Sequence, residues 1–216
     1  MIRALIVDDM PVMRESLPLL MPSIEFVAAY PEADALLGES RPADLVVLDL
    51  HLVNDAQPTA RQGISVIRSL KAAGYRVCVY TQEERRFVLA ACLAAGADGV
   101  VSKAAGVVAA ERSFLRVAAG EVVIPMSLVG LVEVLVRRRS VTLVCPRQRE
   151  LLAGRARGLT YAELARTMYL SEATLRGYWA DICIAVSVFF RDVSPGDLER
   201  ALGVGPGDIV DVWPAR

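Results

Sequence analysis

Residues 45–49 read LVVLD, four apolar residues followed directly by an aspartate. A short apolar run without alternating polar residues is typical of a strand that is buried on both faces of a parallel sheet. Similar runs occur at Ala4–Val7, Phe26–Tyr30, Val77–Tyr80 and Gly99–Ser102. The pattern predicts five buried strands in the first 120 residues.

Segments with helical spacing of apolar residues lie between these runs: Pro11–Leu20, Glu32–Leu37, Ile64–Ala73, Glu83–Ala95 and Val107–Ala119. Several of them end at a glycine, where helices commonly stop. Five strand–helix units in so short a stretch predict a doubly wound, five-stranded parallel α/β sheet. In such a sheet the functional crevice lies beyond the carboxyl ends of the strands.

Chemically active residues stand at four of these strand ends. Asp8 and Asp9 follow the first strand, and Asp49 follows the third. Thr81 and Lys103 follow the fourth and the fifth. Three acids at one sheet edge repel one another unless a cation binds, and Mg²⁺ is the hard ion that carboxylates hold. A carboxylate can then attack a phosphoryl group, whose oxygens a hydroxyl and an ammonium stabilise. Each residue alone could be a cap or a solvated charge, but together they predict a phosphoryl-accepting site.

Positive charge gathers in the second part of the chain. Residues 1–119 carry 12 basic and 14 acidic side chains, whereas residues 137–178 carry nine arginines and three glutamates. Helical patterns run over Arg147–Gly158, Tyr161–Tyr169 and Ser171–Val186, with Thr160 and Ser171 as predicted N-caps. Two helices, a tight turn and a third helix predict a helix-turn-helix, and the arginines favour a polyanionic partner.

These patterns predict the domain organisation. We expect a first domain over residues 1–120, a linker helix within residues 121–140 and an all-α helix-turn-helix domain over residues 141–216. Ser194–Leu202 predicts a further helix with a serine cap, whereas the apolar stretch Ile209–Trp213 stays unassigned. No apolar run reaches the roughly 18 residues that span a membrane, and the start lacks a signal-peptide pattern. We therefore expect a cytoplasmic protein without a membrane partner.

The blocks LIVDD (5–9), LVVLD (45–49), VYT (79–81) and GADGVVSK (96–103) resemble the four signature blocks of response-regulator receiver domains. This resemblance implies a flavodoxin-like fold and phosphorylation of Asp49 by a sensor histidine kinase. It also implies the surroundings of that aspartate. Mg²⁺ would be held by Asp8, Asp9, Asp49 and the backbone carbonyl of His51, and the phosphoryl group would be contacted by Thr81 and Lys103.

The stretch CPRQRELLAGRARGLTYAELARTMYLSEATLRGYW (145–179) resembles the helix-turn-helix of NarL/LuxR (FixJ)-type regulators. The resemblance implies that the helix over Ser171–Cys183 enters the major groove of double-stranded DNA and that the protein forms a homodimer. The residues expected to contact DNA are Arg147, Arg149, Arg166, Thr174, Arg176 and Tyr178, with Arg176 able to bind guanine or a phosphate.

The chain departs from both families at several positions. Gly63 lies 14 residues after Asp49, which makes this loop longer than in typical receivers. Val100 stands where receivers usually carry an aromatic residue that switches on activation, and Gln82 stands where a small residue is usual. After Ile182 the usual ending of the DNA-binding family is absent, which predicts an altered dimer interface.

Four hypotheses follow. The first is a transcription factor in which phosphorylation of Asp49 modulates dimerisation and sequence-specific DNA binding. The second is an atypical regulator that binds DNA independently of phosphorylation and is tuned by a ligand or a protein partner. In the third, the helical module has lost DNA binding and binds a protein. The fourth is a phosphatase-like hydrolase, which would leave the basic helical module without a role.

Overall fold

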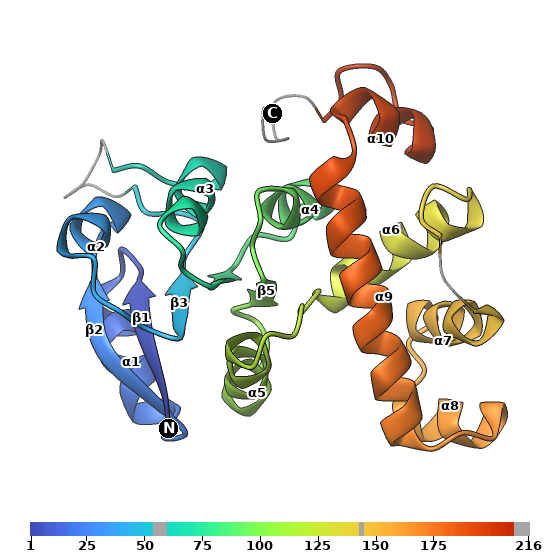
Figure 1. Cartoon of the computed structure of the whole chain (residues 1–216), viewed down its shortest axis with the longest axis horizontal. Coiled ribbons are helices and arrows are strands. Elements are labelled where there is room, and N and C mark those ends of the chain that lie inside the picture. Colours follow the sequence, from blue (N-terminus) through green and yellow to red (C-terminus); the bar gives the residue numbers. More distant parts are fainter. Residues whose placement is uncertain (54–59, 143–144, 210–216) are drawn as a thin grey trace. The chain divides into compact units, whose positions relative to one another are not determined.

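The computed structural model describes residues 1–53, 60–142 and 145–209. The chain forms two compact units, the first ending at Val123 and the second beginning at Ile124 (Figure 1). The apolar stretch Ile209–Trp213 lies outside the described residues except for Ile209, which is buried.

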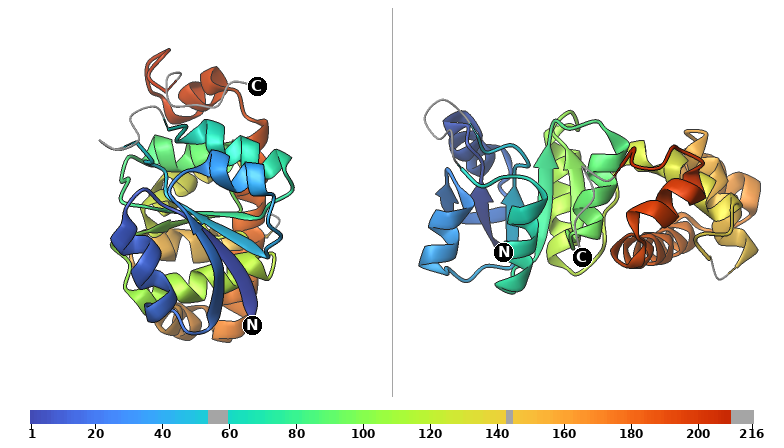
Figure 2. Two further views of the ribbon diagram at one scale, coloured as in Figure 1. Left: turned by 90° about the vertical axis from the view of Figure 1, so that its left-hand side faces the viewer. Right: turned by 90° about the horizontal axis from the view of Figure 1, so that it is seen from above.

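The first unit is a parallel sheet with the strand order β2-β1-β3-β4-β5. Its strands are β1 (Ile2–Val7), β2 (Ile24–Tyr30), β3 (Leu45–Leu48), β4 (Val77–Thr81) and β5 (Gly99–Ser102). Its helices are α1 (Pro11–Leu20), α2 (Ala33–Glu39), α3 (Ile64–Ala72), α4 (Arg86–Ala94) and α5 (Val107–Ala118). The predicted doubly wound α/β fold is confirmed, with α1 and α5 on one face of the sheet and α2, α3 and α4 on the other (Figure 2).

The strands are apolar throughout because both faces of the sheet are covered. Alternate residues such as Ile6, Val47 and Tyr80 share one core with residues of α1 and α5. Tyr80 packs edge-on against the fully buried Phe114 of α5, with ring centroids 5.2 Å apart. The strands are also in register at their carboxyl ends, since Val7 pairs with Leu48 and Leu48 with Val79. The residues that follow β1, β3 and β4 therefore leave the sheet at the same edge.

Helix α4 begins three residues later than the sequence predicts. The expected start was Glu83, but the helix starts at Arg86. The carboxylate of Glu83 accepts hydrogen bonds from the backbone N–H groups of Glu84 and Arg85, at 3.0 and 2.8 Å. The Thr81 hydroxyl accepts one from the backbone N–H of Glu83 at 3.1 Å. Such side-chain bonds compete with the first helical turn and delay it.

The second unit is all-α, as predicted. It contains α6 (Met126–Arg137), α7 (Pro146–Ala156), α8 (Tyr161–Met168), α9 (Glu172–Asp192) and α10 (Pro195–Leu202). Helices α7 and α8 pack against α9, while α6 packs against α7 and α10. The segment expected as a linker helix is therefore part of the core of this unit. The predicted cap of α10 is present, because the Ser194 hydroxyl accepts the backbone N–H of Asp197.

Helix α9 is longer than predicted, since it continues beyond Val186 to Asp192. Neither glycine nor proline occurs between Gly177 and Pro195, so nothing in the sequence stops it earlier. Its apolar residues Val186 and Phe190 are fully buried, which stabilises the extra turns. Among the described residues, α9 alone is long and apolar enough to cross a membrane. Much of its apolar surface, however, is packed inside this unit, as in the core helix of a globular domain.

Candidate phosphoryl-acceptor site and nucleic-acid interface

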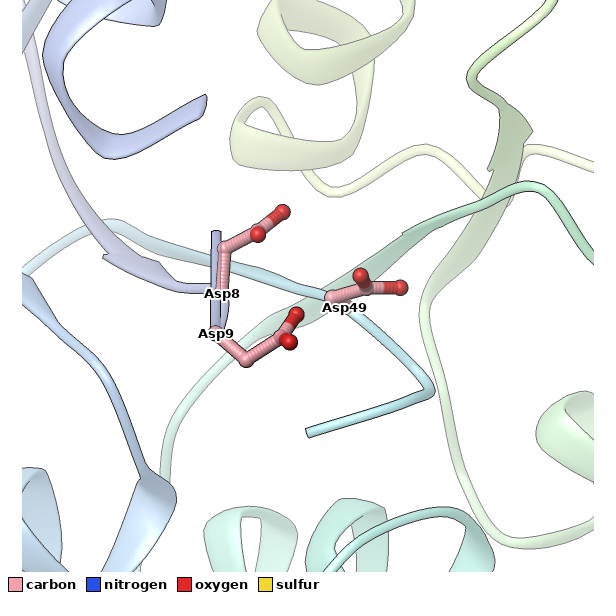
Figure 3. Close-up of side chains that lie close together, drawn as sticks. All are labelled: Asp8, Asp9 and Asp49. Atoms are coloured by element: carbon pink, nitrogen blue, oxygen red, sulfur yellow. The ribbon is translucent and has the colours of Figure 1, made fainter. Parts of the chain in front are cut away.

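Three carboxylates gather at the carboxyl edge of the sheet (Figure 3). Asp8 and Asp9 follow β1, and Asp49 follows β3. One carboxylate oxygen from each lies within 4.8 Å of the others. Asp8 and Asp49 are buried, at 3% and 7% exposure, while Asp9 is partly exposed. The predicted convergence of these acids is therefore present in the structure.

Lys103, which follows β5, bridges two of the acids. Its ammonium lies 2.7 Å from Oδ2 of Asp8 and 2.7 Å from Oδ2 of Asp49. Burial raises the pKa of Asp8, although the hydrogen bond and charge of Lys103 oppose this. Burial alone would lower the pKa of Lys103, but its bonds to Asp49 and Asp8 outweigh burial and leave that pKa raised. One ammonium thus serves two buried carboxylates, and Asp9 adds a third carboxylate close by.

The remaining hydrogen bonds hold the acids in place. Oδ1 of Asp8 accepts the backbone N–H of Met10 at 2.9 Å, and Oδ1 of Asp49 accepts that of Leu50 at 2.7 Å. Arg14 donates to the backbone carbonyls of Asp8 and Asp9, at 2.7 and 3.0 Å. Each bonded carboxylate oxygen keeps a lone pair. Three carboxylate oxygens within 4.8 Å of one another are hard donors of the kind that Mg²⁺ prefers.

Thr81 is the last residue of β4, and His51 lies three residues after the end of β3. Thr81 is fully buried, and its Oγ1 accepts a bond from Glu83, so its proton can be donated elsewhere. The imidazole of His51 is half exposed and its Nε2 lies 3.7 Å from a carboxylate oxygen of Glu83. The imidazole therefore faces Glu83, and the predicted metal ligand of His51, its backbone carbonyl, stays a prediction.

The two ends of the long loop after Asp49 are joined by hydrogen bonds between residues 50–53 and residues 62–63, which together form a stem. The side-chain oxygen of Gln62 accepts the backbone N–H groups of Leu52 and Val53, at 3.1 and 3.3 Å. The backbone N–H of Gly63 donates to the carbonyl of Leu50 at 2.9 Å. Residues 54–59, which contain the extra length, lie outside the described residues. The stem holds the backbone next to Asp49, a role of Gln62 that the sequence analysis missed.

The two unusual receiver positions differ in exposure. Val100 is buried, and Gln82 is exposed next to Thr81. The backbone N–H of Val100 donates to the carbonyl of Val123 at 3.0 Å, so the segment leaving the unit is bonded to the edge of β5. A buried valine cannot rotate an aromatic ring towards Thr81.

The helix-turn-helix has the predicted caps. Thr160 and Glu163 form a capping box, in which each side chain accepts the backbone N–H of the other residue. The turn places Tyr169 at φ 56°, in the left-handed region. The hydroxyl of Ser171 then accepts the backbone N–H of Thr174 at 3.0 Å and caps α9.

The predicted DNA-contacting residues lie on three helices. Arg147 and Arg149 are exposed on α7 and Arg166 on α8, and Arg147 pairs with Glu150 at 2.9 Å. On α9, Thr174 is exposed and its hydroxyl contacts that of Ser171 at 2.8 Å.

The α9 candidates do not share one side of their helix. Thr174 and Tyr178 are four residues apart and share a side, whereas Arg176 lies about 200° around the helix from each. Arg176 is exposed, while Tyr178 is only partly so.

Tyr161 is a residue that the sequence analysis treated only as the start of a helix. The guanidinium carbons of Arg155 and Arg176 lie 4.7 and 4.5 Å from the centre of its ring. Arg176 also pairs with Glu172 at 3.1 Å. In the sequence, the only sign of this contact is an aromatic residue at the first position of a predicted helix within an arginine-rich stretch.

Comparison with known proteins identifies a family. Residues 4–109 match the response regulator receiver domain. The chain is 27% identical over 185 residues to the nitrate/nitrite response regulator protein NarL of Escherichia coli (strain K12), covering 80% of this chain and 83% of NarL.

Among solved structures, a complex of the two-component response regulator RcsB with DNA aligns at a TM-score of 0.53 and 20% identity, covering 89% of this chain and 99% of RcsB. RcsB from Salmonella enterica serovar Typhimurium, bound to a promoter in the presence of the phosphomimetic BeF₃⁻, aligns at 0.54 and 19% identity over the same shares. At 19–20% identity, the likeness to these solved structures shows a shared fold.

Proposed function

Since this chain is a response regulator of the NarL/FixJ type, with its receiver domain in residues 4–109, we propose that Asp49 accepts a phosphoryl group and thereby controls DNA binding by the second unit. The observation that carries the proposal is the buried contact of Lys103 with both Asp8 and Asp49. A lysine held between two acids at the carboxyl edge of a parallel sheet is suited to stabilising a transferred phosphoryl group.

The transfer is a substitution at phosphorus. A carboxylate oxygen of Asp49 attacks the phosphorus of a phosphohistidine on the sensor kinase. The new O–P bond forms as the P–N bond breaks, and the imidazole leaves with the electron pair. Lys103 then moves from Oδ2 of Asp49 to a phosphoryl oxygen, and the Thr81 hydroxyl donates to another. Asp8, Asp9, Asp49 and the carbonyl of His51 would hold Mg²⁺, which when bound supplies charge neutralisation at the phosphoryl oxygens.

The experiment that tests this step is mass measurement of the intact protein after incubation with acetyl phosphate. We expect one phosphoryl group to be added in the presence of Mg²⁺ and very little in its absence. The Asp49→Asn variant should remain unmodified, because an amide oxygen is a poor nucleophile. Modification of that variant to the same extent as the wild type would place the acceptor elsewhere.

The second unit is proposed to bind double-stranded DNA through α9, with Arg176 near the bases and Arg147, Arg149 and Arg166 on phosphates. Thr174 and Tyr178 lie on the other side of α9, so any contact that they make with DNA would be to a different part of the groove. Its support is the capped turn before α9, the exposed arginines and the similarity to NarL. We expect Arg149→Ala to weaken binding to all sequences and reduce its salt dependence, whereas Arg176→Ala should also reduce sequence preference. Equal losses of preference in both variants would contradict these roles.

We also propose that the protein acts as a cytoplasmic homodimer. The neighbour structures include RcsB dimers on DNA. In the present chain, Ile184 and Val188 are about half exposed one turn apart on α9, where apolar contact with a second copy would cover them. Sedimentation of the wild type and of Ile184→Asp, with and without acetyl phosphate, tests this interface. An unchanged dimer in the variant would exclude it.

A specific observation also favours the phosphorylation-independent alternative. Val100 is buried where the switching aromatic is usual, so Asp49 could be modified without a change at that position. DNA affinity that is the same for wild type, acetyl-phosphate-treated protein and Asp49→Asn would favour this second function.

A further inference from the structure

Tyr161 joins three helices of the DNA-binding unit. It is the first residue of α8, while Arg155 comes from the end of α7 and Arg176 from the first turns of α9. Both guanidinium groups lie within cation–π distance of its ring, at 4.7 and 4.5 Å from the centroid. The contact therefore links the recognition helix to the two helices that frame it.

Arg155 fixes the position of the ring. Its Nη1 donates to the carbonyl of Leu159 at 2.8 Å, and its guanidinium lies 5.8 Å from the ring centre of Trp179. Its Nε is buried without a hydrogen-bond partner, and in the described part of the chain it forms no ion pair. A charge that lacks a carboxylate depends on the faces of aromatic rings for compensation. Nη2 of Arg155 also lies 3.1 Å from Sδ of Met126, so the guanidinium that contacts Tyr161 is itself held by neighbouring groups.

Arg176 has two partners although it is exposed. Its side chain is 61% exposed, yet it contacts the Tyr161 ring and, at 3.1 Å, the carboxylate of Glu172. A free arginine loses rotamer freedom when it binds DNA, and prior ordering reduces that loss. Arginine is also the side chain that reads guanine bidentately, which demands a fixed guanidinium plane.

We propose that Tyr161 is a positioning residue for DNA recognition, which holds the guanidinium of Arg176 on the ring supported by Arg155 and so sets base preference. The inference rests on the proposed binding of DNA through α9. Tyr161 acts through Arg176 and needs no contact of its own with DNA.

The first test uses the free protein. In the wild type, the Nε–H resonance of Arg176 should show the shift caused by an aromatic ring, and Tyr161→Phe should keep it. Tyr161→Leu should abolish it, because leucine has similar bulk but no aromatic face. Tyr169→Leu is the matched control, since Tyr169 is 92% exposed and has no ring contact with a cation in the described residues. An Arg176 resonance that is identical in wild type and Tyr161→Leu would overturn the proposal without any use of DNA.

The second test measures dissociation constants with duplexes enriched from a random-sequence pool by the full-length wild type, and with scrambled duplexes. Tyr161→Leu should bind the enriched duplex about 2- to 30-fold more weakly, the range of one cation–π contact. It should bind scrambled duplexes much as the wild type does, and Tyr161→Phe should retain most of the preference. In the Arg176→Ala background, Tyr161→Leu should have almost no further effect, whereas any effect of Tyr169→Leu should persist.

The outcomes distinguish a failure of the positioning role of Tyr161 from a failure of the proposed DNA binding. If Tyr161→Leu weakens binding by the same factor with and without Arg176→Ala, Tyr161 acts independently of Arg176 and the proposal is wrong. If the wild type enriches no sequence from the pool, the proposed DNA function fails, and the resonance of Arg176 still decides whether the positioning contact exists. Melting temperatures of all variants show whether a loss reflects unfolding.

Discussion

At the scale of single residues, Lys103 joins the two buried carboxylates of the proposed acceptor site. It compensates two buried carboxylates at once, and it is one of only two lysines in a chain that otherwise uses arginine. An ammonium can leave one oxygen for another along a flexible stem, whereas a guanidinium prefers a fixed planar fork. Lysine is therefore suited to the proposed transfer, in which the ion pair with Asp49 would be exchanged for a bond to a phosphoryl oxygen.

Replacing this lysine by methionine should destabilise the first unit. Lys103→Met leaves Asp8 and Asp49 buried without their cation, and removing one partner of a buried ion pair costs about 3–5 kcal/mol. Because Mg²⁺ would supply the missing charge, added Mg²⁺ should stabilise the variant more than the wild type. Urea unfolding with and without Mg²⁺ measures both effects.

Lys71→Met provides the matched control for this variant. Lys71 pairs with Asp98 at 2.6 Å, away from the acid cluster, and both side chains are more exposed than Lys103. Its loss should be smaller and independent of Mg²⁺. An equal response of the two variants to Mg²⁺ would contradict the proposed metal site.

Glu83 gives the first unit a dependence on pH. Hydrogen bonds from Arg85, opposed by burial, lower the pKa of Glu83 from 4.5 to about 2. A depressed pKa means that the carboxylate stabilises the fold above the unfolded value of 4.5, and that this contribution is lost as pH falls towards 2. We expect Glu83→Gln to be less stable than the wild type at pH about 6, with the difference shrinking by pH about 4. A constant difference in unfolding free energy over this range would exclude this linkage.

At the scale of elements, two helical glycines of the second unit differ in how closely neighbouring side chains pack against them. A Cβ at Gly154 of α7 would clash with Cδ2 of the buried Leu164, whereas a Cβ at Gly177 of α9 would have no neighbouring atom within 4 Å. The first glycine permits close packing of α7 on α8. The second stands at an exposed position of α9 and only lowers the helix propensity there.

Alanine substitution at these glycines should therefore change stability in opposite directions. Gly154→Ala should destabilise the unit by about 1–3 kcal/mol through overpacking. Gly177→Ala should stabilise it by up to about 1 kcal/mol through helix propensity. Thermal unfolding of both variants measures the difference, and a shift of the same sign in both would show that the local packing around Gly154 is not as described.

Some helix and strand bounds could be predicted from sequence patterns, and others could not. The five strands and the convergence of Asp8, Asp9 and Asp49 could be predicted, because buried parallel strands are continuous apolar runs and their carboxyl ends share an edge. The start of α4 and the end of α9 could not. The first depends on the side chain of Glu83 competing for backbone N–H groups, and the second depends on burial of Val186 and Phe190 by distant residues. The same holds for Tyr161, whose partners come from two other helices.

At the scale of the whole molecule, the proposed function requires that chemistry at Asp49 change DNA binding by a separate unit. The receiver domain and the similarity to NarL support this division of labour. Because Val100 is buried and has no aromatic ring, the proposed signal would have to be carried by another movement than rotation of an aromatic side chain at this position. Modification of Asp49 can change DNA affinity only if the modified and unmodified forms of the protein differ in their affinity for DNA. If the two forms bind DNA equally well, phosphorylation has no effect on DNA binding.

The most direct measurement is DNA affinity of the full chain with and without beryllofluoride and Mg²⁺, in the wild type and in Asp49→Asn. Our account predicts tighter binding of the enriched duplex by the wild type when both reagents are present, and no response from the variant. Equal affinities in all four conditions, with Asp49 nevertheless modified by acetyl phosphate, would contradict the claim that this aspartate controls DNA binding.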